Sequence, residues 1–219
     1  MTRDSDPPPS PPHAPYGNAY TEYQLKRSPL RRWVRRHYLS SAAGKVLNTT
    51  LDFGCGVGEL LALLPEGSVG VEYNPVSVAH CRRLGLHVHW YDGFADDFSL
   101  TTLSLPDNIE TLMLSHVLEH FEDPVHLLHR LVASLSPRLR RIVLIVPGRA
   151  GFRIDPTHRR FVDLDMLIST VHDMPGWHIV SSRYFPLNSR HVGQLFPYNE
   201  LQVVIDRTER SGSGPSHRL

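Results

Sequence analysis

The sequence predicts an α/β protein built around a mainly parallel sheet. Strand-like and helix-like segments alternate along the chain from about residue 46 to residue 206. A glycine-rich segment, residues 51–58, joins one of these strands to the helix that follows it. Residues 141–146 are nearly all β-branched or leucine, which is typical of a strand buried on both faces. Together these features indicate βαβ units packed side by side.

The chain has 219 residues, which suits one well-cored domain with additional terminal segments. Residues 1–15 are rich in proline and serine, and residues 207–219 are rich in serine and glycine, so both are expected to be disordered tails. Between them we expect a basic helical cap over residues 16–45 and the α/β domain over residues 46–206.

Each expected strand is an apolar or β-branched run bounded by turn residues. The expected strands are Val46–Phe53, Ser68–Glu72, Leu86–Trp90, Ile109–Ser115, Arg141–Val146, His178–Phe185 and Leu201–Ile205. The expected helices show helical apolar spacing or a proline near their first turn, and they are Pro29–Ser40, Glu59–Leu64, Pro75–Leu84, Pro124–Ser134 and Asp163–His172. No helix is expected between the last two strands. They are therefore predicted to be antiparallel neighbours at a mixed edge of the sheet.

Composition narrows the function classes. No apolar run approaches the length of a membrane span, and the N-terminal segment lacks the apolar core of a secretory signal. The two cysteines, Cys55 and Cys81, are expected to be free thiols in a reducing cytoplasm. The net charge of +1 gives no global field that would attract nucleic acid.

The glycine-rich loop is the first candidate ligand site. Gly54, Gly56 and Gly58 allow a tight turn and a close approach of a ligand to the backbone. A dinucleotide fingerprint requires a further glycine where Glu59 stands, and this carboxylate would repel a pyrophosphate. No Gly-Lys-Ser/Thr follows, so the loop is not of the Walker type.

Two carboxylates follow the next two expected strands. Glu72 lies about twenty residues past the loop, where an acidic side chain can accept hydrogen bonds from ribose hydroxyls. Asp92 follows the third strand, where its carboxylate can accept a hydrogen bond from an adenine amino group. The loop and both acids at successive strand ends predict a nucleoside-containing ligand.

The segment Asp52-Phe53-Gly54-Cys55-Gly56-Val57-Gly58 resembles the first motif of the class I methyltransferases that depend on S-adenosylmethionine (SAM). The resemblance covers roughly Tyr16 to Asp206. It implies a Rossmann-like three-layer αβα sandwich, whose sheet has seven strands with the last one antiparallel, and SAM as cofactor. The cofactor-binding residues that it implies are Asp52, Gly54, Cys55, Gly56, Gly58, Glu72, Tyr73, Asp92, Gly93, Ser115 and His116.

His116-Val117-Leu118-Glu119-His120 matches the inverted zinc-protease pattern H-x-x-E-H. Here the motif directly follows a strand and is cut off by Asp123-Pro124, which leaves at most two helical turns. We therefore interpret residues 115–123 as the loop after the fourth strand and expect no metal site. The resemblance places Ser115 and His116 beside SAM. His120 is either a structural residue of the loop or part of the site.

A second polar segment, Asp155-Pro156-Thr157-His158-Arg159-Arg160-Phe161, follows the fifth strand. It resembles a segment of methyltransferases found beside genes for surface-glycan and lipopolysaccharide assembly. The resemblance suggests His158 as a general base, with Asp155 orienting it or binding the acceptor, and His116 as a further catalytic candidate. The alternative is a structural loop held by an ion pair from Asp155 to Arg159 or Arg160.

The expected N-terminal helix places Arg31, Arg32, Arg35 and Arg36 on one face, opposite an apolar stripe that includes Tyr38. This face is either simply solvated or attracted to a phosphorylated acceptor or an anionic membrane surface. Tyr16, Tyr20 and Tyr23 precede the helix and are candidates for an aromatic lid.

The sequence therefore predicts a SAM-dependent enzyme that methylates a hydroxyl, preferably on a sugar of a surface polysaccharide or its precursor. The acceptor rests on resemblance alone, since a fold does not fix function. Two alternatives stay open: a small-molecule O- or N-methyltransferase of secondary metabolism, and a non-catalytic SAM-binding regulatory subunit. Nucleic acid is not expected as acceptor, because Ser115-His116-Val117-Leu118 stands where an Asn/Asp-Pro-Pro-Tyr/Phe motif would be.

Overall fold

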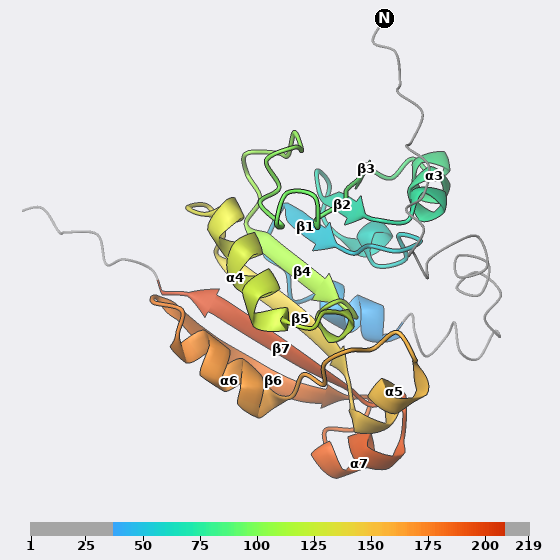
Figure 1. Ribbon diagram of the computed structural model, residues 1–219, viewed down its shortest axis with the longest axis vertical. Helices are drawn as coiled ribbons and strands as arrows, with labels where there is room; N and C mark the ends of the chain where they lie inside the picture. Colours follow the sequence, from blue (N-terminus) through green and yellow to red (C-terminus); the bar gives the residue numbers. More distant parts are fainter. Residues whose placement is uncertain (1–36, 209–219) are drawn as a thin grey trace, which may run out of the picture.

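The computed structural model describes residues 37–208, and a seven-stranded sheet runs through them (Figure 1). The strand order is β3-β2-β1-β4-β5-β7-β6. The strands are β1 (Thr50–Phe53), β2 (Val69–Glu72), β3 (Val88–Trp90), β4 (Thr111–Ser115), β5 (Arg141–Pro147), β6 (Trp177–Phe185) and β7 (Glu200–Arg207). The first five strands pair in parallel, and β7 is antiparallel to both β5 and β6. The predicted mixed edge is confirmed.

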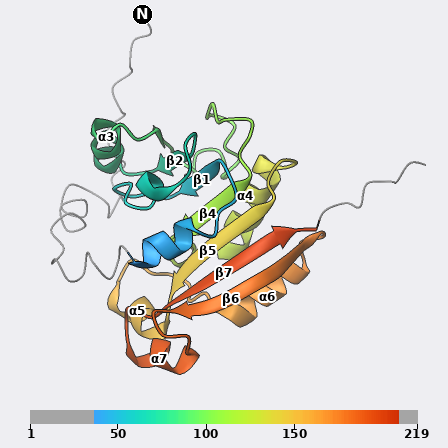
Figure 2. The same cartoon turned by 180° about the vertical axis from the view of Figure 1, so that it is seen from behind.

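Helices cover both faces of this sheet. They are α3 (Pro75–Arg83), α4 (Pro124–Leu135), α5 (Arg149–Ile154), α6 (Leu164–His172) and α7 (Arg190–Leu195), with 3-10 turns at Leu61–Leu63 and Leu118–His120 and a helical segment at residues 37–43. Figure 1 shows α4 and α6 in front of the sheet, and Figure 2 shows residues 37–43 on the opposite face. The predicted three-layer arrangement is confirmed.

The helix starts follow local chemistry. Asn74, Asp123 and Asp163 each precede a helix and accept a hydrogen bond from a backbone N–H of its first turn. Such side chains satisfy N–H groups that have no partner within the helix. Pro75 and Pro124 then occupy the first helical position, where the missing N–H costs nothing.

The core forms because neighbouring residues of the central strands point to opposite faces. Leu112 and Leu114 of β4 belong to the large cluster that includes α4 and α6. Met113, between them, packs with Tyr38 and Leu39 of the helical segment on the other face. All of β5 except its first residue is buried, as the sequence predicts for a strand covered on both sides.

Several segments of the structure differ from the predicted elements. Residues 59–64 form only the 3-10 turn Leu61–Leu63, because Gly58 and Pro65 leave too little chain for a longer helix. The short helix α7 lies between β6 and β7, where none was expected, and α5 was also missed. Both have six residues with an internal glycine, so neither shows helical apolar spacing. Strand β7 extends to Arg207, into the predicted tail.

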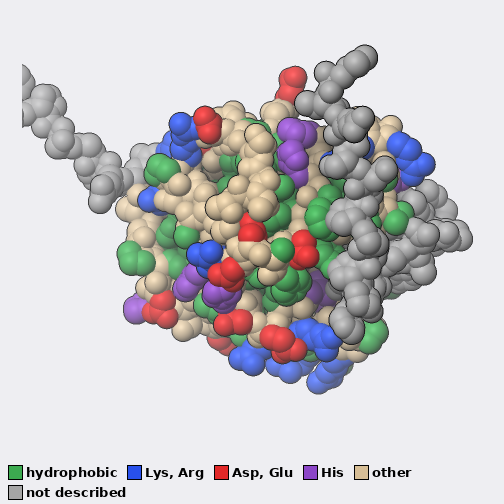
Figure 3. Space-filling model, turned by 45° about the horizontal axis from the view of Figure 1, so that its top comes forward, with side chains coloured by type: hydrophobic (Ala, Val, Ile, Leu, Met, Phe, Trp, Pro, Cys, Tyr) green, Lys and Arg blue, Asp and Glu red, His purple; other side chains and the backbone are tan. Residues whose placement is uncertain are grey.

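Several predictions lie outside the described residues: both terminal tails apart from residues 207–208, the arginine face of the N-terminal helix and the three tyrosines that precede it. The described part of that helix runs to residue 43, past the expected end at Ser40, and Tyr38 is buried as predicted. Among residues 37–208, no helix combines the length and apolar character needed to span a membrane. Figure 3 shows acidic and basic side chains mixed over one face, with Lys and Arg gathered along its lower edge.

Candidate active site

The predicted site residues lie at the ends of neighbouring strands, along one edge of the sheet. The carboxyl ends of parallel strands meet at such an edge, where open α/β sheets bind ligands. The segment after β4 packs directly on the glycine-rich loop after β1. A Cβ atom added to Gly54 would lie 2.7 Å from Cγ2 of Val117. The loop and the first histidine motif are therefore adjacent, as the sequence predicts.

The glycine-rich loop has the backbone that its composition indicates. Gly54, Gly56 and Gly58 have φ angles of 74°, 56° and 77°, in the left-handed region that favours glycine. Cys55 is buried in the loop, and the thiol of Cys81 lies 3.4 Å from the carbonyl oxygen of Gly56. Both cysteines are free thiols, as expected.

Glu72 fastens this loop to the end of β2. Its Oε2 accepts a hydrogen bond from the Gly56 N–H at 2.8 Å, and its Oε1 accepts one from the Asn74 N–H at 2.8 Å. Each carboxylate oxygen has a second lone pair, so Glu72 keeps acceptor capacity for a ligand hydroxyl.

Asp52, the acidic residue of β1, is buried behind the loop. Its Oδ2 atom has no hydrogen-bond partner within the described part of the chain. Burial, and to a lesser degree the neighbouring Glu72 carboxylate, raises the pKa of Asp52 to about 7. A buried carboxyl group of this kind favours a cation beside it.

Three further predicted cofactor residues, Tyr73, Asp92 and Gly93, lie just beyond β2 and β3. The carbonyl of Tyr73 accepts a hydrogen bond from the Trp90 indole at 2.7 Å, and burial together with the Asp92 charge raises the pKa of Tyr73. Asp92 accepts a hydrogen bond from the Phe94 N–H. Gly93 is buried under Phe98, with no room for a side chain. These contacts bring Tyr73 and Asp92 close together.

His116, directly after β4, is held between two carboxylates. Its Nδ1 lies 3.1 Å from Oε1 of Glu119, and its Nε2 lies 3.2 Å from Oε1 of Glu200. Burial alone would lower the pKa of His116, but the two carboxylates outweigh it and raise the pKa to about 10. His116 is therefore a cation at neutral pH. Both of its ring nitrogens carry a proton, so they can donate hydrogen bonds but cannot accept them.

This ion-pair arrangement predicts a pH-dependent stability. Because the folded pKa of His116 exceeds its usual 6.5, its stabilisation is complete below about pH 6.5 and is lost as the pH rises toward 10. We expect the free energy of unfolding to fall by up to about 5 kcal/mol over this range, since each tenfold change in proton affinity corresponds to about 1.4 kcal/mol. Denaturant titrations should show a smaller fall for His116→Gln. The control His126→Gln, at an exposed pair with Asp97, should behave like the unchanged protein.

Glu119 connects the two histidine segments. It is completely buried, and its backbone carbonyl accepts the N–H groups of Arg159 and Arg160 at 2.7 and 3.1 Å. Its Oε1 lies 4.0 Å from Nε2 of His158, and its Oε2 has no hydrogen-bond partner among residues 37–208. Sequence reasoning considered Glu119 only as part of a zinc motif and missed Glu200, whose position follows from the pairing of Pro147 with Glu200 across β5 and β7.

His158 has a defined tautomer. Its Nδ1 lies 2.9 Å from the carbonyl oxygen of Phe152, which can only accept, so the ring proton is on Nδ1 and the lone pair is on Nε2. The ring stacks on Phe152 at 5.3 Å between centroids. Nε2 faces Glu119 and Asp155, whose Oδ2 is 3.9 Å away. A proton taken up at Nε2 would therefore face these two carboxylates.

Asp155 shapes the loop in a way that the sequence did not indicate. Its Oδ1 accepts hydrogen bonds from the N–H and the hydroxyl of Thr157 at 2.9 and 2.6 Å. Burial raises the pKa of Asp155, but these hydrogen bonds and the nearby histidines outweigh it, so the pKa is lowered. The alternative ion pairs from Asp155 to Arg159 or Arg160 do not occur within residues 37–208.

Glu119, His120 and His158 bring ligand atoms within 4.8 Å of one another. The Nδ1 of His120 lies 3.1 Å from the Thr157 hydroxyl. Two imidazoles and a carboxylate are ligands that zinc accepts. The sequence did not indicate this grouping, because His158 lies far along the chain from His120. A proton and a metal ion would thus compete for the lone pair on Nε2 of His158.

Comparison with known proteins identifies the family. Residues 18–204 match the family model described as a methyltransferase domain, which covers most of the chain. No curated protein matches the chain significantly.

Solved structures share the fold. A SAM-dependent methyltransferase from Archaeoglobus fulgidus is 22% identical, with a TM-score of 0.60 over 84% of this chain and 99% of that one. Magnesium protoporphyrin IX methyltransferase from Synechocystis PCC 6803, with bound S-adenosylhomocysteine (SAH), is 14% identical, with a TM-score of 0.61 over 88% and 96% of the two chains. The plantazolicin methyltransferase BpumL, in complex with SAH, is 14% identical, with a TM-score of 0.57 over 86% and 88%. The chain belongs to the methyltransferase-domain family, and its fold is that of the SAM-dependent methyltransferases.

Proposed function

We propose that this methyltransferase transfers a methyl group from SAM to a hydroxyl group, on a sugar of a surface polysaccharide or its precursor. The observation that carries the proposal is the packing of the glycine-rich loop against the segment that holds His116 and Glu119, with His158 beside them. A donor site and a proton-accepting group then lie at one edge of the sheet.

The cofactor site fits SAM in chemical terms. The loop after β1 offers backbone without side chains at Gly54, Gly56 and Gly58, and Glu72 offers acceptor oxygens for ribose hydroxyls. The unpaired, buried Oδ2 of Asp52 favours a positively charged ligand. Tyr73, Asp92, Gly93, Ser115 and His116 complete the proposed set. Bound SAM supplies an electrophilic methyl group on a sulfonium centre.

Proton removal is the step that this chain itself has to supply for a hydroxyl acceptor. A neutral hydroxyl oxygen is a weak nucleophile, and a positioned base strengthens it as the bond to the methyl carbon forms. We propose that Nε2 of His158 takes this proton, while Asp155 and Glu119 stabilise the resulting imidazolium. Alignment of the two reactants supplies much of the remaining acceleration.

A small-molecule acceptor is the second candidate. Two of the similar structures are methyltransferases named for magnesium protoporphyrin IX and for plantazolicin, neither of which is a sugar. Two arginines of the loop between α5 and α6, Arg159 and Arg160, are exposed and favour an anionic or polar acceptor over an apolar one.

Calorimetry with SAM and SAH tests the donor assignment, and mass spectrometry of candidate acceptors tests the transfer. We expect both ligands to bind, and a sugar-containing acceptor to gain the mass of one methylene unit. If neither ligand bound at millimolar concentration, the proposal would be lost. Tight SAM binding without turnover on any acceptor would instead favour a regulatory subunit.

The raised pKa of Asp52 predicts a pH-dependent affinity for SAM. A cation beside the carboxyl group favours its ionised form, so binding weakens when the group is protonated below about pH 7. From the change in ionised fraction, we expect the Kd to fall about tenfold between pH 6 and pH 8. Calorimetry should show this slope for the unchanged protein and for Asp92→Asn, and a flat profile for Asp52→Asn. A slope that persists in Asp52→Asn would contradict the assignment.

A further inference from the structure

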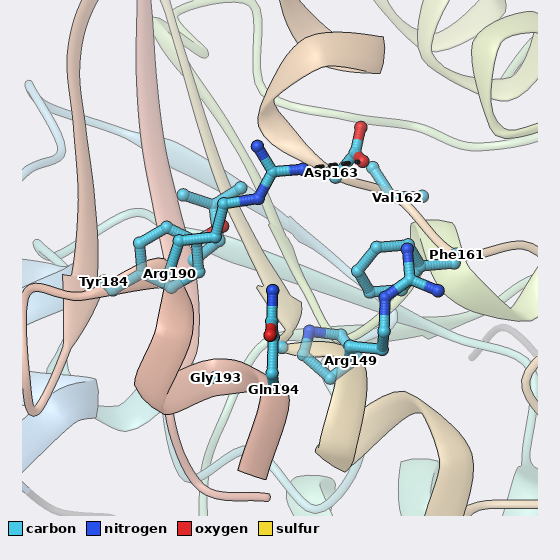
Figure 4. A pocket seen from close by; sticks show the side chains of 11 residues that line it. Arg149, Phe161, Val162, Asp163, Tyr184, Arg190, Gly193 and Gln194 are labelled. Carbon is cyan, nitrogen blue, oxygen red and sulfur yellow. Dashed lines mark ion pairs between the residues drawn. The ribbon is translucent and has the colours of Figure 1, made fainter. Parts of the chain in front are cut away.

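A polar pocket lies beside the proposed acceptor site, between the end of β5, the helices α5 and α7, and the strand β6 (Figure 4). Arg149 and Phe161 form one side, Tyr184 and Arg190 the other, and Gln194 lies between them. The mechanism proposed above uses none of these side chains.

Arg149 is the cation of this pocket that lacks a counter-charge. Its guanidinium lies 4.4 Å from the ring centroid of Phe161. Within residues 37–208, no ion pair connects Arg149 to an acidic side chain. A guanidinium stacked on an aromatic ring keeps its N–H groups available in the plane, where they can bind a carboxylate or phosphate in bidentate fashion.

Arg190 faces Arg149 across the pocket. It pairs with Asp163 at 3.8 Å and with Asp165 at 3.4 Å, which are long distances for charge-assisted contacts. Its side chain is 57% exposed, so it can turn toward a ligand without losing a buried contact. Asp163 lines the pocket and Asp165 lies beside it, so both carboxylates serve Arg190, and Arg149 is the cation left without a counter-charge.

The walls of the pocket are fixed by close backbone packing between α5 and α7. A Cβ atom on Gly148 would lie 2.5 Å from the carbonyl oxygen of Asn199 and 2.8 Å from that of Gly193. The carbonyl of Asn199 also accepts the Gly148 N–H. Arg149 and Arg190 begin α5 and α7, and this packing fixes the distance between the two helices. Binding of a ligand between the arginines therefore needs little reorganisation.

A row of aromatic contacts connects the pocket to the proposed base. Phe161, under Arg149, lies 5.4 Å from Phe152, and Phe152 stacks on His158 at 5.3 Å. An acceptor with its hydroxyl at His158 would therefore have to extend past Phe152 to place an anionic group beside Arg149.

We propose that Arg149, assisted by Arg190 and Gln194, binds an anionic group of the methyl acceptor, either a phosphate or the carboxylate of an acidic sugar. The inference rests on the proposed function, because it assigns a second contact to the same acceptor. It restricts that acceptor to an anionic one.

The test is an NMR titration of the SAH-loaded protein with inorganic phosphate, with glucuronate and with glucose. We expect phosphate or glucuronate to shift resonances of α5 and α7, and glucose to bind at least about tenfold more weakly. Binding of phosphate alone assigns a phosphorylated acceptor, and binding of glucuronate alone assigns an acidic sugar. Binding of neither anion, or equal binding of glucose, overturns the proposal.

Variants locate the effect. Arg149→Ala should weaken anion binding about tenfold, whereas Arg149→Lys should weaken it less, because the charge is kept and the planar fork is lost. The matched control Arg153→Ala changes an exposed arginine of the same helix that does not line the pocket. An equal loss in Arg153→Ala would contradict the site. SAH affinity, measured in every variant, separates the two proposals: loss of anion binding with SAH binding intact overturns only the anion site, whereas a protein that binds neither SAH nor SAM overturns the proposed function.

Discussion

Replacing His158 with Gln should lower kcat by on the order of 10²- to 10⁴-fold, with the Kd for SAM unchanged. The Phe152 carbonyl accepts a hydrogen bond from Nδ1 of His158, and the amide of Gln can still donate to this carbonyl. The amide offers no basic lone pair to the acceptor, however. Single-turnover kinetics with a hydroxyl acceptor, combined with calorimetry of SAM, would measure both quantities. The loss of rate should be largest at the pH where the acceptor hydroxyl is fully protonated.

Two controls accompany this variant. His172→Gln changes a histidine of α6 whose side chain is 87% exposed, and it should leave kcat unchanged. Metal analysis of the unchanged protein decides the competing assignment, because His158 can act as a base only if Nε2 carries no ion. We expect substoichiometric zinc. Unchanged turnover in His158→Gln would remove this residue from the chemistry, whereas stoichiometric zinc would reassign it as a ligand.

Gly54→Ala should lower the affinity for SAM at least about thirtyfold. The backbone at this position has a φ of 74°, which costs a residue with a side chain about 1–2 kcal/mol. The new methyl group would also lie 2.7 Å from Cγ2 of Val117, so the loop and the segment after β4 have to separate. Because the cofactor is proposed to lie on this loop, the displacement acts directly on its binding site.

The sequence offers a matched control and a rescue for this variant. Gly85→Ala has the same kind of backbone penalty, with a φ of 76°, but its methyl group meets nothing within 4 Å. It should destabilise the fold by a similar strain while leaving SAM affinity intact. Adding Val117→Ala to Gly54→Ala removes the clash and should restore part of the affinity. If Gly85→Ala weakened SAM binding equally, the effect would be one of general stability.

The parts of the fold that could be predicted from the sequence are those determined by local chemistry and periodicity. Asn74, Asp123 and Asp163 cap helices whose starts the sequence indicates, and the apolar run of β5 predicts its buried position. The helices α5 and α7 were missed because they are stabilised by contacts between distant segments. The close approach of Gly148 to Asn199 is one such contact, and no local pattern reports it.

The candidate site likewise has a part that the sequence predicts and a part that depends on distant contacts. The positive φ angles of the glycine-rich loop follow from residue type, so this half was predictable. Glu119 lies only three residues after His116, but Glu200 is far along the chain, and only the antiparallel register of β7 brings Glu200 to His116. Pairing of Asp155 with an arginine was the structural alternative for this loop, but its short side chain reaches Thr157, two residues away, at a lower conformational cost.

The position of β7 has a consequence for the order in which the protein is made. This strand is translated last of the seven, yet it lies between β5 and β6, and within the described residues β6 pairs only with β7. A growing chain that has not yet produced residues 200–207 therefore leaves β6 without a neighbour and His116 without one of its two carboxylates. Completion of the sheet and of the charge cluster is thus a late event of folding on the ribosome. In unfinished chains the edge of β5 would have no paired strand. Because unpaired edges promote aggregation, such chains should depend most on chaperones at that stage.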